Sequence, residues 1–264
     1  MKALITGASS GIGEELAKIM AADGHSLILV ARREEKLEFL ATKLTQKYSV
    51  PVKFFKADLT NIQDREKLIE FSKTEGVDTL INNAGFGIAG RFAQTNLEKN
   101  LEMIELNISA LVHLTRALVP GMIAKGDGRI LNVASIAAFV PGAYMSVYYA
   151  TKAFVHSHTV ALSEELAGTG VTISGLYPGP TVTEFNQVAG VQGLDAFRKN
   201  MFMDAATVAD IGYRGMQRGQ LLILPGYKNK LIAALTKVLP VKVQARLIKI
   251  ANGKRVEAAA LHQS

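Results

Sequence analysis

The sequence predicts an α/β fold, in which one doubly wound parallel sheet of seven strands carries helices on both faces. Short apolar runs alternate with longer stretches of helical periodicity over the first 224 residues. One run, Ser26–Ala31, is apolar almost throughout, which is typical of a parallel strand that is buried on both faces. A glycine-rich turn, Thr6–Gly13, joins the first run to the first helical stretch.

Each element is predicted from the spacing of its apolar residues and from the turn-forming residues at its ends. The expected strands are Lys2–Thr6, Ser26–Ala31, Val52–Ala57, Val77–Asn82, Arg129–Ala134, Val171–Tyr177 and Gln220–Leu224. The expected helices are Gly11–Asp23, Arg33–Tyr48, Asn61–Glu75, Leu97–Ala124, Ser146–Ala167 and Ala205–Arg218. Segment 179–204 lacks clear periodicity, and we expect either a mobile substrate lid or a plain surface loop there.

Composition excludes several classes of chemistry. The chain of 264 residues contains no cysteine, so structural disulfides, thiolate catalysis and cysteine-bound zinc are excluded. None of the 5 histidines lies three or four positions from another, so no metal site is predicted. The first strand starts at residue 2, which leaves no room for a signal peptide, and no apolar run has the length of a membrane span. We therefore expect a cytoplasmic protein.

The C-terminal residues differ from the rest of the chain in charge. The net charge is +7, and residues 225–256 contain eight lysines and arginines and no acidic residue, so the remainder is nearly neutral. This contrast predicts a catalytic domain over residues 1–224 and a basic amphipathic extension over residues 225–264.

The extension is expected to contain a basic amphipathic helix that starts after Pro240. Apolar and basic side chains recur there at helical spacing, namely Val243, Leu247 and Ile250 beside Lys242, Arg246 and Lys249. An earlier apolar stripe comprises Leu231, Leu235, Val238 and Leu239. We rank the body of the chain or a second subunit first as its partner, an anionic membrane surface second, and an acyl carrier or CoA third. No recognition motif accompanies the bases, so no nucleic-acid partner is predicted.

The glycine turn predicts a site for a dinucleotide. Its glycines allow backbone N–H groups to approach a pyrophosphate at the start of the following helix, as in Rossmann-type domains. The expected contacts are Gly7, Ser9, Ser10, Gly11, Ile12 and Gly13. The same residues also fit Gly-x-Ser-x-Gly, the elbow of serine hydrolases. That alternative ranks low, because an elbow on the first strand has no earlier loop to supply an oxyanion donor.

The end of the second strand indicates which dinucleotide binds. A site for NAD places a carboxylate there to hold the ribose 2′-hydroxyl. Here Ala31 stands at that position and is followed by Arg32 and Arg33, whose guanidinium groups suit the extra phosphate of NADP. The sequence therefore predicts NADP(H) as the cofactor.

A tyrosine and a lysine form the predicted catalytic pair. Tyr148 and Lys152 lie four positions apart in a helical stretch, so their side chains share one face. A nearby ammonium stabilises a phenolate and lowers the pKa of the phenol, which suits proton transfer while a hydride moves. Ser135, at the end of the fifth strand, has a hydroxyl that can hold a substrate oxygen.

Taken together, these motifs resemble the short-chain dehydrogenase/reductase family over about residues 1–224. The resemblance extends to further motifs in the family's order and spacing, namely Asp58-Leu59, Asn82-Asn83-Ala84-Gly85, Asn107, Pro178-Gly179 and Thr183. It implies a Rossmann-type sheet and a nicotinamide-dependent oxidoreductase. It also implies homo-oligomers assembled through the helices Leu97–Ala124 and Ser146–Ala167.

The resemblance also implies a role for each matched residue. Tyr148 would be the general acid in reduction, Lys152 would tune Tyr148 and hold the nicotinamide ribose, and Ser135 would orient the carbonyl. Asn107 would anchor a water that links Lys152 to solvent. Asn82 would steady the sheet. The remaining cofactor contacts would come from Asp58 and Leu59 at the adenine, from Asn83, Ala84 and Gly85 along the ribose path, and from Pro178, Gly179 and Thr183 near the nicotinamide.

The surroundings of the predicted site favour an apolar substrate, such as a ketone or a 3-oxoacyl thioester. The expected pocket residues are Phe86, Phe92, Phe139, Val140, Tyr144, Met145, Phe185, Phe197, Met201, Phe202 and Met203. We therefore predict an NADPH-dependent carbonyl reductase. The alternatives are an alcohol or 3-hydroxy acid dehydrogenase that works in the oxidative direction, and a dinucleotide-binding module without turnover.

Overall fold

The computed structural model describes residues 1–182, 184–185, 203–236 and 238–261, and confirms the predicted fold class. A single sheet contains seven parallel strands in the order β3-β2-β1-β4-β5-β6-β9. These strands are β1 (Lys2–Thr6), β2 (Ser26–Ala31), β3 (Val52–Lys56), β4 (Thr79–Asn82), β5 (Gly128–Val133), β6 (Val171–Leu176) and β9 (Leu222–Ile223). The chain order reverses between β1 and β4, which is where open α/β sheets bind their ligands.

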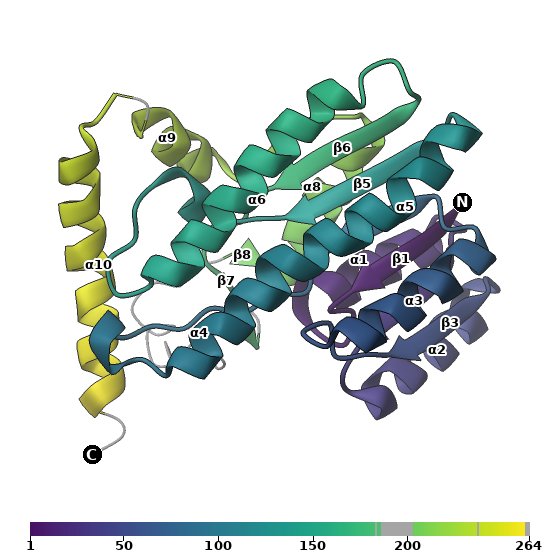
Figure 1. Cartoon of the computed structure of the whole chain (residues 1–264), viewed down its shortest axis with the longest axis horizontal. Helices are drawn as coiled ribbons and strands as arrows, with labels where there is room; N and C mark the ends of the chain where they lie inside the picture. The colour runs from purple at the N-terminus through teal and green to yellow at the C-terminus, as the bar shows by residue number, and fades with distance from the viewer. Residues whose placement is uncertain (183, 186–202, 237, 262–264) are drawn as a thin grey trace.

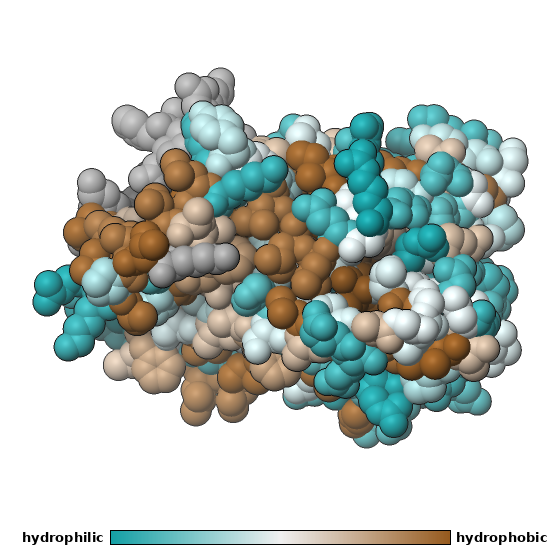
Figure 2. All heavy atoms as spheres, turned by 90° about the horizontal axis from the view of Figure 1, so that it is seen from above, coloured by the Kyte–Doolittle hydropathy of each residue, from teal (hydrophilic) through white to brown (hydrophobic). Residues whose placement is uncertain are grey.

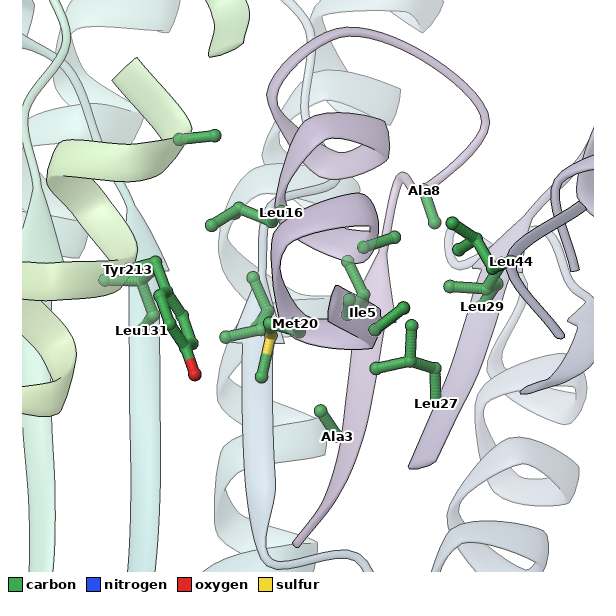
Figure 3. Close-up of a cluster of buried hydrophobic side chains, with 14 of the residues drawn as sticks. Ala3, Ile5, Ala8, Leu16, Met20, Leu27, Leu29, Leu44, Leu131 and Tyr213 are labelled. Atoms are coloured by element: carbon green, nitrogen blue, oxygen red, sulfur yellow. The ribbon is translucent and has the colours of Figure 1, made fainter. Parts of the chain in front are cut away.

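Helices cover both faces of the sheet (Figure 1). They are α1 (Gly11–Ala22), α2 (Glu34–Tyr48), α3 (Ile62–Glu75), α4 (Leu97–Ile104), α5 (Leu111–Lys125), α6 (Ser146–Glu165), α8 (Ala205–Gln217), α9 (Tyr227–Leu235) and α10 (Val241–Leu261). Successive strand residues point to opposite faces, so β1 sends Ile5 toward α1, α2 and α8 and sends Leu4 toward α3 and α5. Figure 3 shows Leu16 and Met20 of α1 packed over the strands on the first of these faces.

The expected helix Leu97–Ala124 is interrupted by a wider turn. A π-helical segment, η2 (Glu105–Ala110), lies between α4 and α5, and it contains Asn107. Such insertions frequently mark functional sites. Apolar spacing does not reveal them, because one extra residue in a turn leaves the buried stripe nearly unchanged.

By length and composition alone, Leu97–Lys125 is apolar enough to cross a membrane, contrary to the expectation from the sequence. Its most apolar window has a mean hydropathy of 1.3, and 44% of that window is buried inside the protein. Leu114, Leu118 and Met122 pack against the sheet. The stretch is therefore apolar because it contributes a helix to the protein core.

Segment 179–204 is described at residues 179–182, 184–185 and 203–204. Thr181–Val182 (β7) and Met203–Asp204 (β8) form a small parallel pair separate from the main sheet. Residue 183 and residues 186–202 lie outside the described part of the chain, so the expectation of a lid or a plain loop there stays a prediction.

The C-terminal residues form two helices at one end of the molecule (Figure 1). The expected helix after Pro240 is present as α10, and Asn252 fixes it to the body by donating to the carbonyl of Ala143 at 2.9 Å. The stripe of Val243, Leu247 and Ile250 is exposed, with 40%, 53% and 61% of each residue's surface accessible. The first-ranked expectation was packing against the body of the chain or a second subunit. Its first part is therefore wrong for these side chains, and contact with a second subunit stays a prediction.

Candidate active site

A cleft at the carboxyl ends of the strands brings the predicted motifs together. It has a volume of about 790 Å³. The predicted residues that line it are Gly7, Ser9, Ser10, Gly11, Ile12, Arg32, Arg33, Asp58, Leu59, Asn83, Ala84, Gly85, Ser135, Tyr148, Lys152, Pro178 and Gly179. Thr183, which was predicted to contact the nicotinamide, lies outside the described residues.

The glycine turn bends tightly and leaves the start of α1 open to the cleft. Gly7 and Gly11 have φ angles of +65° and +59°, in the left-handed region that glycine adopts without strain. Ser10 stands at the N-cap of α1, yet its side chain makes no capping hydrogen bond. The first N–H groups of α1 are therefore aimed at the cleft without a side-chain cap, which suits an anion.

Thr6 and Asn83 hold the glycine turn against the end of β4. The Thr6 hydroxyl accepts hydrogen bonds from the backbone N–H groups of Asn83 and Ala84, at 2.9 and 3.0 Å. The Asn83 amide in turn donates to the carbonyls of Thr6 and Gly7. Gly13 does not line the cleft. It lies against the turn itself, where a Cβ would collide with the Asn83 amide and the Gly7 carbonyl, so only glycine fits there.

Asn82 has the structural role that the resemblance implied. It is buried and donates to Thr115 and Asn132 at 3.0 and 2.9 Å, which joins β4 to α5 and β5 beneath the cleft.

Arg33 is the central cation at the far end of the cleft, the end formed by Ser9, Ser10 and Glu184. Its Nε and Nη2 donate to the Ser9 hydroxyl at 3.2 and 2.9 Å, and Nη2 also donates to the Ser10 hydroxyl at 3.0 Å. Its Nη1 donates to the carboxylate of Glu184 at 2.7 Å. Arg32 points elsewhere, toward Glu102 at 3.6 Å and Asp58 at 4.0 Å. The two arginines therefore have different partners, although they are adjacent in sequence.

Tyr148 and Lys152 project from α6, and Ser135 lies across from them at the end of β5. All three line the cleft, and Tyr148 and Lys152 are buried, as the shared helix face predicts. Ser135 forms a hydrogen bond with the Tyr148 side chain, and its oxygen accepts from the backbone N–H of Ala137. Lys152 Nζ lies 5.9 Å from the centre of the Tyr148 ring and donates to the carbonyl of Val133 at 2.8 Å.

Burial dominates the ionisation of this pair. Desolvation raises the pKa of Tyr148 above its ordinary value of 10, and the hydrogen bond with Ser135 only partly opposes that rise. Desolvation also lowers the pKa of Lys152 to about 8. The expected lowering of the pKa of Tyr148 by the ammonium is therefore wrong for the protein alone, because burial disfavours the phenolate more strongly than its neighbours stabilise it.

Asn107 lies behind the cleft rather than in its lining. Its Oδ1 accepts from the Phe86 N–H at 3.1 Å, and its Nδ2 donates to the Phe86 carbonyl and the Thr151 hydroxyl, each at 3.0 Å. The π-helical turn thus connects the loop after β4 to the helix of Tyr148. A Cβ at Gly85 would lie 2.9 Å from Asn107 Oδ1 and 3.6 Å from Lys152 Nζ, so the three positions adjoin one another.

The expected apolar pocket is present in part. Phe86, Met145 and Phe185 line the cleft, and the ring centres of Phe185 and Tyr148 lie 5.4 Å apart. Phe139 packs instead on Tyr177, and Phe92 is exposed. Three further expected residues do not line the cleft, namely Val140, Tyr144 and Met203. Phe197, Met201 and Phe202 lie outside the described residues.

Three contributors to the site were not predicted from the sequence. Thr151 accepts from Asn107, and Lys36 donates to the carboxylate of Glu184 at 2.8 Å. Lys36 follows Arg33 at helical spacing, which was a usable signal. Glu184 meets Arg33 across 151 positions of sequence, and no local pattern indicates such a contact.

Ser9 does not have the surroundings of a hydrolase nucleophile. Its hydroxyl contacts Arg33, which cannot act as a general base. Of the three histidines that follow in the order a hydrolase needs, His156 bonds to Tyr177 and His158 stacks on Phe154. The third, His262, lies outside the described residues.

Comparison with known proteins points in the same direction. The family model described as short chain dehydrogenase matches residues 1–192. An uncharacterized oxidoreductase of Staphylococcus epidermidis is 35% identical over 79% of this chain and 87% of its own length. Among solved structures, a short-chain dehydrogenase from Sphingobium yanoikuyae in complex with NADPH is 33% identical, with a TM-score of 0.81 over 90% of this chain and 96% of its own. A bulky-bulky ketone specific alcohol dehydrogenase from Comamonas testosteroni is 31% identical, with a TM-score of 0.76 over 90% of this chain and 94% of its own.

Proposed function

Since this chain belongs to the short-chain dehydrogenase/reductase family of oxidoreductases, we propose that it reduces an apolar carbonyl substrate with NADPH. The observation that carries the proposal is the convergence of Tyr148, Ser135 and Lys152 on one cleft that also contains the glycine turn. Acid–base catalysis requires such groups within hydrogen-bond reach of the reacting oxygen. Ketones, or 3-oxoacyl-type carbonyls, are the substrate class that we propose.

The residues of the cleft divide the chemistry among them. NADPH, when bound, supplies the hydride that adds to the carbonyl carbon. The Ser135 hydroxyl holds the carbonyl oxygen, and Tyr148 donates its phenolic proton to that oxygen as negative charge develops on it. Lys152 stabilises the phenolate that remains, and its pKa of about 8 allows it to pass a proton on near neutral pH. We assign Asn107 a positioning role, because it contacts Phe86 and Thr151 rather than the cleft.

The surroundings of Arg33 support NADPH rather than NADH. Two similar solved structures hold NADPH, a third holds 5-hydroxy-NADP and a fourth holds NAD, so family membership alone does not decide the cofactor. Arg33 and Lys36 already hold a carboxylate, that of Glu184, and Ser9 and Ser10 lie against the same guanidinium. Hydrogen-bond donors that bind this carboxylate can bind the 2′-phosphate of NADPH as well. NADH has a 2′-hydroxyl instead, and Ala31 offers it no carboxylate partner.

An apolar substrate is supported by the lining near Tyr148. Phe86, Ile88, Met145 and Phe185 line that part of the cleft, and the ketone-specific relative from Comamonas testosteroni has the same fold. Apolar walls with a few converging polar groups are typical of sites for apolar small molecules. The alternative, oxidation of an alcohol or of a 3-hydroxy acid, uses the same residues in reverse.

The experiment that tests this proposal is an NADPH-oxidation assay. Aliphatic and aromatic ketones, 3-oxoacyl thioesters and aldehydes are offered to the wild type and to Tyr148→Phe in parallel. We expect turnover with an apolar ketone or a 3-oxoacyl thioester, and loss of nearly all of that rate in Tyr148→Phe with NADPH affinity retained. Binding of NADPH without turnover of any carbonyl or alcohol would instead support a cofactor-binding module.

We also propose that the protein contacts a membrane surface from the cytoplasm through residues 225–264. Apolar side chains on α9 and α10 are exposed, namely Leu231, Leu235, Val241, Leu247 and Ile250, and no acidic residue occurs in 225–256. Figure 2 shows hydrophobic residues gathered at the end of the molecule where these helices lie. A basic face with exposed apolar side chains suits an anionic lipid surface.

Vesicle co-sedimentation tests this contact. The full chain should sediment with vesicles that contain phosphatidylserine, and less so at high salt. Leu247→Glu together with Ile250→Glu should abolish binding, whereas Phe39→Glu, at an even more exposed apolar position on α2, should not. Absence of the wild type from such vesicles would remove the proposal.

A further inference from the structure

The far end of the cleft holds an anion that belongs to the protein itself. The two carboxylate oxygens of Glu184 accept from different cations, Oε2 from Arg33 at 2.7 Å and Oε1 from Lys36 at 2.8 Å. The Ser10 side chain also hydrogen-bonds to this carboxylate. These hydrogen bonds, that of Lys36 first, lower the pKa of Glu184 to about 2 although partial burial opposes them, so the group is ionised at neutral pH.

The same donors are those that a phosphate monoester would use. A guanidinium fork, an ammonium and serine hydroxyls converge here beside the open N-terminus of α1. Two anions cannot share one arginine and one lysine at full strength, because they repel each other and divide the same hydrogen-bond donors. Either the carboxylate or a phosphate can therefore be fully bound at this position, but not both.

We propose that Glu184 is a specificity-determining residue, an internal anion that competes with the cofactor's 2′-phosphate for Arg33 and Lys36. This inference rests on the proposed use of NADPH. NADPH displaces the Glu184 carboxylate when it binds, whereas NADH, which has only a 2′-hydroxyl, leaves the carboxylate in place. Glu184 thus lowers the affinity for NADPH and keeps Arg33 and Lys36 paired when no phosphate is present.

Calorimetric titration with NADPH and with NADH tests the competition on the full chain. In Glu184→Gln the Kd for NADPH should fall by about fivefold, the scale of one or two exposed ion pairs, and the Kd for NADH should stay within about twofold of wild type. Glu34→Gln is the matched control. It removes the same charge one residue from Arg33, but Glu34 pairs with Lys56 at 3.1 Å and not with Arg33. Both of its Kd values should remain those of the wild type.

Two results would overturn the inference. If Glu184→Gln leaves the Kd for NADPH unchanged or raises it, the carboxylate does not compete with the phosphate. A raised Kd would mean that the carboxylate instead orders Arg33 for the cofactor. If the affinities for NADPH and NADH rise together, the effect is one of general charge and not of the 2′-phosphate. Failure of the proposed NADPH preference would appear separately, as a wild type that binds NADH at least as tightly as NADPH.

Discussion

At the scale of single residues, the site depends on a lysine that is costly to bury. Burial lowers the pKa of Lys152 from 10.5 to about 8, so the unfolded chain binds more protons than the native protein between these pH values. The cost of burying the ammonium is fully present below pH 8 and is relieved as the pH rises through 8 toward 10.5. At pH 7 the free energy of unfolding is thus lower than it would be with an uncharged side chain at this position.

Comparison of the wild type with Lys152→Met measures this cost. From pH 7 to pH 9.5 the free energy of unfolding of the wild type should rise, relative to that of the variant, by about 2 kcal/mol. Urea unfolding of both proteins at both pH values gives this difference, and the variant serves as the control for all other titrating groups. A difference that does not change with pH would mean that Lys152 keeps an ordinary pKa in the native protein.

Arg33 is the residue on which the cofactor prediction depends. Arg33→Gln should weaken NADPH binding by about tenfold to a hundredfold, because charge-assisted hydrogen bonds to the phosphate are lost, and should alter NADH binding much less. Arg32→Gln is the matched comparison, since Arg32 points toward Asp58 and Glu102. Titrations that show equal losses of NADPH affinity in both variants would contradict separate roles for the two arginines.

At the scale of elements, the π-helical turn joins the loop after β4 to α6, the helix that carries Tyr148. Asn107→Ala removes three hydrogen bonds, two to the Phe86 backbone and one to Thr151, and leaves buried polar groups unpaired. We expect a loss of about 2 to 3 kcal/mol in the free energy of unfolding and a fall in kcat that exceeds any rise in KM. Thr151→Val removes only one of these bonds and should cost less.

Denaturant unfolding and steady-state kinetics of both variants decide the point. If Asn107→Ala costs no more stability than Thr151→Val, the two bonds to the Phe86 backbone contribute nothing. If Asn107→Ala loses stability but keeps the kcat of the wild type, Asn107 is structural only.

Elements were predictable from the sequence where a local run of residues suits only one structure. The apolar run Ser26–Ala31 is a central strand because only apolar side chains tolerate burial on both faces. The turn Gly7–Gly13 is where it was expected because glycine alone takes its φ angles without strain. The π-helical turn at Asn107 and the contact of Arg33 with Glu184 were not predictable, because both depend on tertiary contacts that leave no local periodicity.

At the scale of the whole molecule, exposed apolar side chains point to assembly. Leu97, Leu101, Ile104 and Ile123 are exposed on α4 and α5. These helices form one of the two stretches through which the family resemblance implies homo-oligomers, the other being that of α6. We therefore propose that the protein forms at least a dimer. Leu101→Glu should reduce the sedimentation coefficient to that of a monomer and leave the Kd for NADPH unchanged, because Leu101 does not line the cleft. A wild type that sediments as a monomer would contradict this proposal.

The most direct test of the central claim follows the hydride itself. NADPH that carries deuterium at both C4 positions is incubated with the best carbonyl substrate, and the alcohol product is analysed by mass spectrometry and NMR. The account predicts one deuterium on the carbinol carbon with the wild type and almost no alcohol with Tyr148→Phe. Alcohol without deuterium, or equal product from both proteins, would contradict hydride transfer from NADPH with Tyr148 as the proton donor.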